Sequence, residues 1–491
     1  GVSQVFFLSL VLPWQGTAVN TMVVPYGTIP INERESGTAT PPLLSNESGV
    51  LLARTDENQK SNSSVMTGFL VLNYMIGSGI LNTPQTFRDS GIAATTVLYC
   101  IACPAVWLGS VALIRAGEEW RAKMKSAPRK LEFAALATDT LAPTSDTPDG
   151  VSLFPCMPVA HNWSLIVDGS IVLQNTGAVC SYVILLGGLA TSLLSELLEY
   201  FEATGWWDSF YFVTPLVVFT AVLYVSSLKH FGDLSWVAGL SLCTISFLFV
   251  YVVTWSHADA AAARDLTVGK TALDAPLVWW NWIGSFRKIG SIVFALTCAP
   301  AAFHSYNPMK HRTESEWERV ITTSVILGGG MCYFTGLFGY LSFRDAVDGD
   351  ILSNLSGFYG RVFKFLVAFH LVCYIPGEVI VLRSSLFGLL GMKPDIVSDA
   401  WRVVWTAGIL GLIVLTVSQL KIMGAADGDI FGDMLDLTGG VAASLTNFVL
   451  PALIYLHAPR EGKGQYHTAC TLLYWLGGAL MVIVPVAVFN S

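Results

Sequence analysis

Charged side chains are scarce in this chain. Aspartate, glutamate, lysine and arginine make up 13% of its 491 residues, whereas hydrophobic residues make up 53% and the mean hydropathy is +0.57. A soluble domain of ordinary composition carries about 25% charged residues. Half that amount leaves too little polar surface for water, which excludes a soluble enzyme and a disordered chain. We therefore expect a protein that is dissolved in a lipid bilayer.

Basic residues and a disulfide framework are also lacking. The 27 lysines and arginines are outnumbered by 35 acidic residues, which argues against a nucleic-acid partner. Of the nine cysteines only Cys156 falls in a polar stretch, so they do not form the pattern of a secreted disulfide scaffold. Cys100 and Cys103 form a C-x-x-C inside an apolar run without metal partners nearby, so we expect no metal site there.

The first 64 residues differ in composition from the rest. No basic segment precedes the apolar patch from Val5 to Leu12, so we expect no signal peptide. Residues 31–64 are rich in serine, threonine, asparagine, glutamate and proline, a composition typical of disorder. We therefore expect residues 1–64 to form a disordered tail and residues 65–489 to form the membrane domain.

Eleven apolar runs are long enough to cross a bilayer, which takes about 20 residues in a helix. Their uniformly apolar composition indicates helices rather than alternating strands. We therefore expect an all-α polytopic membrane protein with 11 transmembrane helices. The runs are 66–87, 92–114, 163–190, 209–228, 235–256, 289–308, 320–343, 361–387, 403–420, 430–456 and 468–489.

Lysine and arginine are distributed unevenly over the loops. Most of them lie in the tail and in every second loop after it, including the basic start of the loop at 115–162. The loop at 191–208 contains four acidic residues, namely Glu196, Glu199, Glu202 and Asp208, and no basic one. Because positive charge is retained on the cytoplasmic side, we expect the N-terminus to be cytoplasmic.

Two of the runs are interrupted near their middle. The first contains Gly77, Gly79 and Pro84, and the sixth contains Pro300. Glycine weakens a helix and proline removes an amide donor. Inside a membrane such a break must line a buried cavity, where the amides of the second half-helix suit a small carboxylate. Kinks that only serve helix packing remain the alternative.

The two interruptions hold equivalent places in the two halves of the chain. A five-plus-five inverted repeat places broken helices at its first and sixth spans. We therefore expect repeat one at 65–256, repeat two at 289–456 and an extra helix at 468–489.

Several motifs occur along the chain in a fixed order. They are Asn73-x-x-x-Gly77-Ser78-Gly79-Ile80-Leu81, Leu173-Gln174-Asn175-x-Gly177-Ala178, Phe294-Ala295-x-x-Cys298-x-Pro300, Pro376 with Arg383, and Asp429-Ile430-Phe431-Gly432. Over roughly residues 65–489 this set resembles the amino acid/auxin permease family of the amino acid–polyamine–organocation superfamily. The likeness is greatest to its sodium-coupled neutral amino acid transporters.

The resemblance implies a LeuT-like fold with broken helices 1 and 6, and alternating access around a central site for a neutral amino acid. Amides near Gly77, Ser78 and Gly79 would bind the substrate carboxylate. Carbonyls near Thr297, Cys298 and Ala299 would bind its ammonium group, and Asn175 is expected to contribute to this substrate site. Asn73 matches the asparagine that relatives place at the cation site, beside Tyr74. A hydrogen bond from Asn73 to a neighbouring helix is the alternative.

The eighth run departs from the sodium-coupled relatives. These tend to carry a hydroxyl residue shortly before the proline of this span, whereas the residues before Pro376 here are Cys373, Tyr374 and Ile375. Glu378 follows two residues later, at a depth where a carboxylate is costly unless it is paired, protonated or hydrated. Helical spacing puts Tyr374 on the same face as Glu378. One hypothesis is that Glu378 carries or gates a coupling proton. The other is a structural pair with Arg383 or with another helix.

Other polar residues in the runs have weaker assignments. We interpret Asp168 as a hydrated gate, His304 and His370 as packing residues, and Asp433 with Asp436 as a hydrated pair at the outer end of the tenth run. Asn354 precedes Leu355 and Ser356, a glycosylation acceptor pattern in an expected outer loop.

The leading interpretation is a secondary active transporter of neutral L-amino acids, driven by a gradient of H⁺ or Na⁺. The alternative is an amino acid sensor that binds at the same site and signals without substantial flux. We expect no enzyme, because no catalytic cluster occurs, and no cofactor, because no phosphate-binding loop occurs. Relatives work at the plasma membrane or on lysosomal and vacuolar membranes, and the sequence does not determine the oligomeric state.

Overall fold

A computed structural model describes residues 62–123, 130–142, 159–200, 205–265, 272–355, 357–392, 397–423, 427–458 and 464–490. Regular structure in these ranges is helical, apart from one isolated bridge between Asn62 and Met309. The tail expected at 1–64 lies outside the described residues, except for Asn62, Ser63 and Ser64.

Within the described residues, nine helical segments are long and apolar enough to cross a membrane, and a bent pair makes a tenth. The bent pair is α3 (Ser64–Met75) with α4 (Gly79–Ser90). The nine are α5 (Ile92–Lys123), α7 (Val159–Tyr200), α10 (Ser235–Asp265), α11 (Trp282–Ala295) with α12 (Ala299–Tyr306), α13 (Glu314–Phe343), α14 (Gly357–Leu389), α15 (Asp399–Ile422), α16 (Asp427–Thr438) through α17 (Leu450–His457), and α18 (His467–Phe489).

The fourth expected span is shorter than the others. Residues Phe210–Ser226 form α8 (Phe210–Val217), the π segment η2 (Val218–Val222) and α9 (Leu223–Ser226). Each of the eleven predicted runs therefore coincides with a helical segment, although this one falls below the length of a full span. The repeat boundaries at 65–256 and 289–456 stay predictions.

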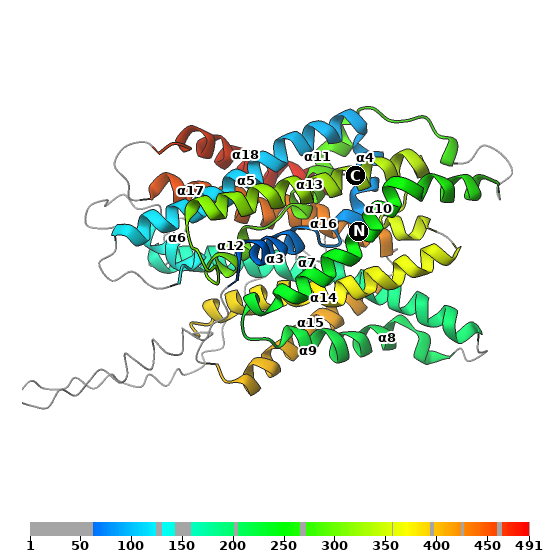
Figure 1. Ribbon diagram of the computed structural model, residues 1–491, viewed down its shortest axis with the longest axis horizontal. Helices are drawn as coiled ribbons and strands as arrows, with labels where there is room; N and C mark the ends of the chain where they lie inside the picture. The colour runs from blue at the N-terminus through cyan, green and yellow to red at the C-terminus, as the bar shows by residue number, and fades with distance from the viewer. Residues whose placement is uncertain are drawn as a thin grey trace, which may run out of the picture. The chain divides into compact units, whose positions relative to one another are not determined.

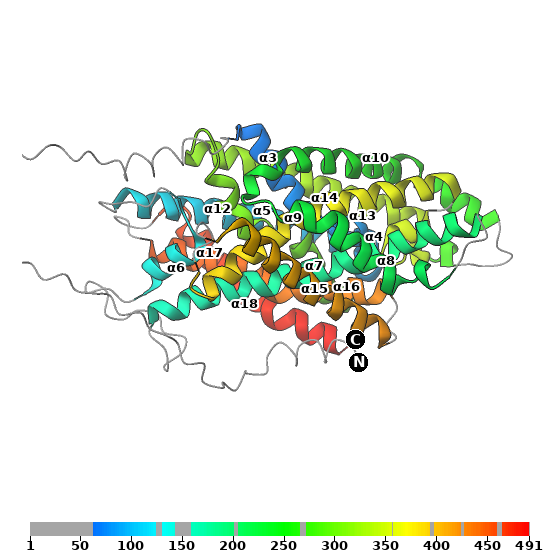
Figure 2. The same ribbon diagram turned by 90° about the horizontal axis from the view of Figure 1, so that it is seen from below.

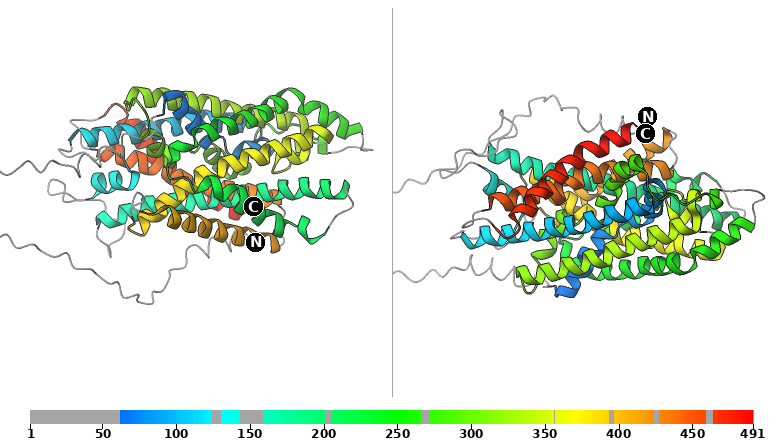
Figure 3. Two further views of the ribbon diagram at one scale, coloured as in Figure 1. Left: turned by 60° about the horizontal axis from the view of Figure 1, so that its bottom comes forward. Right: turned by 90° about the horizontal axis from the view of Figure 1, so that it is seen from above.

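The long helices run side by side, horizontally in Figure 1. We call the end of the bundle that carries the start of α3 the tail end, and the opposite end the far end. Helix α14 packs along α7 more extensively than any other pair of elements, and α13 packs against α3, α4 and α5. Helix α18, red in Figure 3, covers α11 and α17.

The sixth span is the most enclosed part of the bundle. In the most apolar 18-residue window of this span 94% of the residues are buried, against 28% in that of α18 and 33% in that of α15. In Figure 1 α18 lies on the upper side of the bundle and α15 on the lower side, while Figure 2 shows the same helices from below. A helix that is buried all round must meet its neighbours' backbones closely, so the sixth span is where the packing is least tolerant of bulk.

Spans six and ten approach each other backbone to backbone. A Cβ atom added at Gly439, in the π segment η7 (Gly439–Ala443), would lie 1.8 Å from the carbonyl oxygen of Gly290 in α11. A Cβ added at Gly290 would lie 2.1 Å from the carbonyl oxygen of Asp436. Small residues at membrane-helix contacts allow such approaches, and here glycine is required on both sides.

A short helix occurs where the sequence suggested only a loop. Helix α6 (Phe133–Leu141) lies at the tail end and packs against α7 and α17. Just before it, the Leu131 amide donates to Oδ1 of Asn307 at 3.0 Å, and Nδ2 of Asn307 donates back to the Leu131 carbonyl at 2.8 Å. The rings of Phe133 and Phe303 meet edge to face at 6.1 Å. These contacts fasten the loop to the end of the sixth span.

We expect Gly290→Ala and Gly439→Ala each to destabilise the protein, by about 1–3 kcal/mol or more, because the new methyl group overlaps the backbone of the partner helix. Gly408→Ala on α15 is the matched control, since a Cβ there meets nothing within 4 Å. The thermal midpoint of each purified variant in detergent measures the effect. Equal midpoints for all three would contradict the close approach of spans six and ten.

Candidate functional site

The break in the first span lies between Met75 and Gly79, and its two half-helices are bent by 49°. A Cβ at Gly77 would lie 2.6 Å from the hydroxyl oxygen of Tyr374 and 2.8 Å from that of Tyr182. A Cβ at Gly79 would lie 2.8 Å from Cβ of Ala295 in α11. The predicted break is therefore present, and its glycines let spans three, six and eight press against the opened backbone.

The start of α4 is a buried helix N-terminus without a side-chain cap. Ser78 occupies the N-cap position, is 0% exposed, and makes no capping hydrogen bond. The first amides of a helix have no acceptor within the helix, and together they carry a partial positive charge. The amides at Ser78 and Gly79 thus point a positive end into the protein, as a carboxylate site requires.

The break in the sixth span, unlike that in the first, is capped by a side chain. Residues 296–298 separate α11 from α12, and Asn447 in η8 (Leu445–Val449) reaches into the gap. Its Oδ1 accepts from the amides of Cys298 at 3.1 Å and Ala299 at 3.0 Å, and its Nδ2 donates to Oγ1 of Thr297 at 3.3 Å. The amides of the second break are therefore occupied by the protein itself.

Asn447 was missed from the sequence, although a signal existed. It is the only asparagine in the apolar run 430–456. A buried amide side chain must find partners, and its neighbours in sequence cannot satisfy it fully. The network extends through Thr446, whose hydroxyl donates to Gln174 of α7, and through Sγ of Cys298, which lies 3.0 Å from the Ser110 hydroxyl. Four spans thus meet at this break.

Four of the predicted residues gather beside the first break. Oε1 of Glu378 and the backbone carbonyl of Tyr74 each lie 2.9 Å from the hydroxyl oxygen of Tyr374. The Tyr74 hydroxyl donates to Oδ1 of Asn175 at 3.3 Å, and Nδ2 of Asn175 donates to the Glu378 carbonyl at 3.2 Å. Asn175, expected at the substrate, therefore lies in the cluster of the expected ion-coupling residues.

Glu378 is only 4% exposed, and its Oε2 has no hydrogen-bond partner among the described residues. The alternative of an ion pair with Arg383 does not agree with the structure. Arg383 donates to the carbonyls of Ser226 and Leu228, each at 2.8 Å, and to the Thr406 hydroxyl at 2.6 Å. Its charge is directed at α9 and α15, so Glu378 is buried without a basic partner in the part of the chain that the structure describes.

Asn73 lines a cavity of about 10 Å³ together with Tyr74, Phe231 and Tyr374. That volume holds about one water molecule. Oδ1 of Asn73 is buried and without a partner in the described part of the chain. A buried oxygen without a partner among these residues thus belongs to the residue one turn before Gly77. The described residues contain no group of three or more His, Cys, Asp or Glu that could hold a metal ion.

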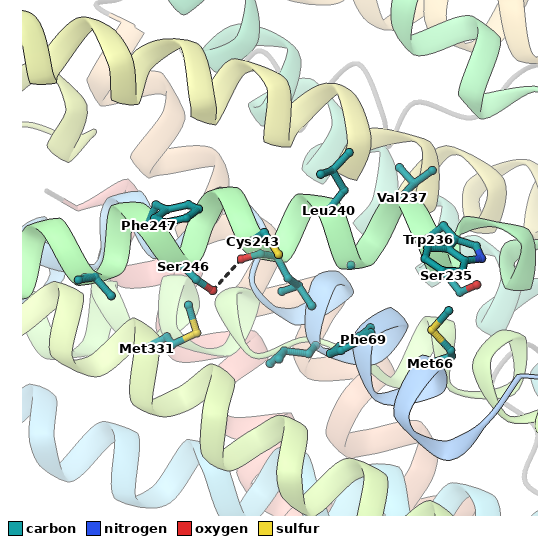
Figure 4. Close-up of a pocket in the computed structure, with 14 residues that line it drawn as sticks. Met66, Phe69, Ser235, Trp236, Val237, Leu240, Cys243, Ser246, Phe247 and Met331 are labelled. Atoms are coloured by element: carbon teal, nitrogen blue, oxygen red, sulfur yellow. Dashed lines mark hydrogen bonds between the residues drawn. The ribbon is translucent and has the colours of Figure 1, made fainter.

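The larger groove near the first span has a different character. It measures about 940 Å³ and lies between α3, α10 and α13, lined by apolar side chains that include Phe69, Leu240, Phe247 and Met331 (Figure 4). The Ser246 hydroxyl donates to the Leu242 carbonyl of its own helix. Trp236 on the rim is 78% exposed. Because its lining is almost entirely apolar, this groove has the character of a lipid-facing surface.

The interpretation of Asp436 as hydrated is wrong. Asp436 is 0% exposed and lies 2.9 Å from Nζ of Lys288, which is also 0% exposed. The Ser291 hydroxyl donates to the same carboxylate, and Arg287 pairs with Asp433. The expected run at 289–308 left Lys288 outside the span, but α11 begins earlier, at Trp282.

This buried pair connects three spans at the far end. Nζ of Lys288 also lies 3.4 Å from Oε1 of Gln85 and 3.7 Å from Oδ2 of Asp89, both on α4. Spans one, six and ten are thereby joined by charged and polar contacts.

The remaining candidates have local partners. A Cβ at Gly388 would lie 2.5 Å from Oδ2 of Asp168, which is 7% exposed and packed against α14. His370 bonds the Ser241 hydroxyl at 2.7 Å, as a packing residue does. Asn354 donates to the Ala346 carbonyl at 2.6 Å, and its glycosylation stays a prediction.

A family model for the transmembrane amino acid transporter protein family matches residues 60–489. The chain belongs to this family. A curated relative, sodium-coupled neutral amino acid symporter 2 of Danio rerio, is 23% identical over 450 residues, which cover 86% of this chain and 81% of that protein. The family expected from the sequence is thereby confirmed.

Solved structures of other transporters share the fold of this family member. A manganese transporter of Eremococcus coleocola, solved with an aromatic bis-isothiourea substituted compound, has a TM-score of 0.54 at 11% identity, covering 87% of this chain and 86% of that chain. A mutant of that transporter gives 0.51 at 13% identity, covering 92% and 88%. The LeuT-like fold is confirmed.

Asn447→Leu should leave two amides at the second break unsatisfied, at a cost of about 1–3 kcal/mol each. Asn447→Asp keeps the acceptor for both amides and loses only the donor. We therefore expect the leucine variant to lose more thermal stability, and to raise the KM of the transporter more, than the aspartate variant. Equal behaviour of the two would show that the cap is not what Asn447 contributes.

Asp436→Leu should destabilise the protein by about 3–5 kcal/mol, because it leaves a buried ammonium without its main partner. The double variant Lys288→Met/Asp436→Leu removes both charges, so we expect it to recover most of the thermal midpoint. A double variant as unstable as Asp436→Leu alone would mean that the two charges do not stabilise each other.

Proposed function

We propose that this transporter is a secondary active carrier of neutral L-amino acids that works by alternating access. The observation that carries the proposal is the pair of opened spans, which meet at the contact between Gly79 and Ala295. The family, together with a relative named as a sodium-coupled neutral amino acid symporter, supports amino acids as the substrates.

The two breaks divide the recognition of an amino acid between them. The uncapped amides at Gly77, Ser78 and Gly79 bind the carboxylate, since only this break offers free donors with a positive helix end. The carbonyls near Thr297 and Cys298 bind the ammonium group, because Asn447 occupies the amides of that break but leaves its carbonyls an accepting lone pair.

The residues around the second break limit the size of the substrate's side chain. The second break and the turn after it are lined by alanines, Ala299, Ala301 and Ala302, all of them buried. These leave room for small or medium neutral side chains.

The gradient of H⁺ or Na⁺ acts at Asn73, Tyr74, Tyr374 and Glu378. Asn175 contributes by positioning Tyr74 and Glu378.

The protein crosses the plasma membrane or the membrane of a lysosome or vacuole, with its N-terminus on the cytoplasmic side. No cofactor and no chemical change of the solute are part of the proposal.

Uptake of labelled neutral amino acids into proteoliposomes tests the proposal. Sodium and proton gradients are imposed separately. We expect saturable uptake by the parent protein and a loss of about tenfold or more in Gly77→Ala, because its methyl group overlaps two hydroxyls and costs about 1–3 kcal/mol. Gly330→Ala is the control, since nothing lies within 4 Å of a Cβ there.

If Gly77→Ala and Gly330→Ala take up the amino acids equally well, the first break does not contribute to the substrate site. Saturable binding by the parent without flux under either gradient would support the sensor instead.

A further inference from the structure

The Tyr374 hydroxyl lies among more oxygens than one proton can serve. It is 2.9 Å from the carbonyl oxygen of Tyr74, 2.9 Å from Oε1 of Glu378 and 3.3 Å from the hydroxyl oxygen of Tyr182. A phenol has a single proton to donate. Of its three neighbours, the carbonyl can only accept, and Tyr182 can donate its own proton to Tyr374. The protonation state of Glu378 therefore decides whether the cluster is satisfied.

An ionised Glu378 leaves the cluster one hydrogen bond short. A carboxylate only accepts, so Tyr374 would have to choose between Oε1 and the Tyr74 carbonyl, and the other oxygen would face it at 2.9 Å without a proton between them. A protonated Glu378 removes the conflict. It donates to the Tyr374 oxygen, Tyr374 donates to the Tyr74 carbonyl, and both short contacts become hydrogen bonds.

The Tyr74 carbonyl needs a partner in this place. It belongs to the last turn of α3, where carbonyls have no amide of their own helix to accept from. Tyr74 is 4% exposed, so bulk water does not reach it. A carbonyl left unpaired at such a buried place is costly. A donor or a cation must supply the bond, and Tyr374 supplies it because Gly77 has no side chain in the way.

We propose that a proton on Glu378 holds Tyr374 against the Tyr74 carbonyl and so latches span eight to the broken first span, with the tyrosine in the place of a bound cation. Loss of the proton turns Tyr374 toward the carboxylate and frees the carbonyl, which loosens α3. This inference rests on the proposed function and makes the proton the coupling ion. The proton enters and leaves with the conformational cycle, and no bond of the solute changes.

The titratable side chains that interact with Glu378 are Tyr74 from α3, Tyr182 from α7 and Tyr374 on its own helix. Closer to its ends α14 carries Arg361 and Lys364, which face Glu196 of α7. Further groups on α14 or on elements packed against it include His370, Arg383, Asp168, His304, Arg402, Tyr251, Asp233 and Asp350. Of these, His370 and Arg383 are bonded elsewhere, as described above. Asp350 needs a control, because burial raises the pKa of its carboxyl to about 7, in the loop between α13 and α14.

The test uses the full chain in proteoliposomes, with Glu378→Gln, Tyr374→Phe and Asp350→Asn. Substrate affinity and internal acidification are measured from acid to alkaline pH. For the parent we expect proton-driven accumulation and an affinity that falls by up to about tenfold per pH unit once Glu378 deprotonates, the limit for one linked proton. Glutamine can donate to Tyr374 permanently, so Glu378→Gln should bind substrate at every pH without accumulation.

Tyr374→Phe keeps the ring and removes the hydroxyl, so we expect weakened binding that no longer varies with pH. Asp350→Asn should behave like the parent. Proton-driven accumulation in Glu378→Gln, or a parent-like pH profile in Tyr374→Phe, would overturn the latch. So would loss of the pH profile in Asp350→Asn. Absence of flux in the parent under any gradient would instead contradict the proposed function.

A spectroscopic readout covers the case in which Glu378→Gln does not fold. Asp168 and Asp350 are buried carboxyl groups too, so both are replaced for this measurement. Infrared difference spectra of Asp168→Asn/Asp350→Asn between acid and alkaline pH should contain the band of the protonated Glu378 carboxyl group. Adding Tyr374→Phe to this double variant should shift that band, because the carboxyl group has lost its acceptor. An unshifted band would mean that Glu378 does not donate to Tyr374, and the latch would be refuted.

Discussion

A backbone amide or carbonyl released from a helix inside a membrane finds no water to bind, so protein, solute or ion must satisfy it. The first and sixth spans both release such groups at mid-depth, between Met75 and Gly79 and between Ala295 and Ala299. The surrounding structure is arranged around this demand. Glycines allow neighbouring helices to approach the opened backbone, and polar side chains on spans three, eight and ten are directed at it.

The two breaks meet the demand in different ways. In the sixth span the neutral amide of Asn447 caps the second half-helix, with no titratable group involved. In the first span the amides of α4 have no side-chain cap, and the last carbonyls of α3 depend on a tyrosine beside a buried carboxyl group. Because Asn447 caps it, the second half of the sixth span does not depend on a ligand for its hydrogen bonds. The first span has no such cap, so its conformation depends on the solute or ion that binds there.

The two ends of the bundle are closed by different chemistry. At the far end a buried ammonium and carboxylate join spans one, six and ten, and separating such charges is costly until water reaches them. At the tail end two neutral hydrogen bonds between Leu131 and Asn307 hold the loop, each worth about 1 kcal/mol. The charged pair at this end, Arg115 with Glu314 at 2.9 Å, is partly exposed.

The sequence by itself determined the membrane class, the eleven helical segments, the two breaks, the family, and the neighbourhood of Tyr374 and Glu378 one helical turn apart. These depend on composition and on spacing along a single helix, which are local properties. Only the tertiary structure decided that Asn447 caps the sixth span, that Lys288 pairs with Asp436, and that Arg383 turns away from Glu378. Each of these partners lies on another helix, and apolar periodicity places a residue on a face without showing which distant side chain that face will meet.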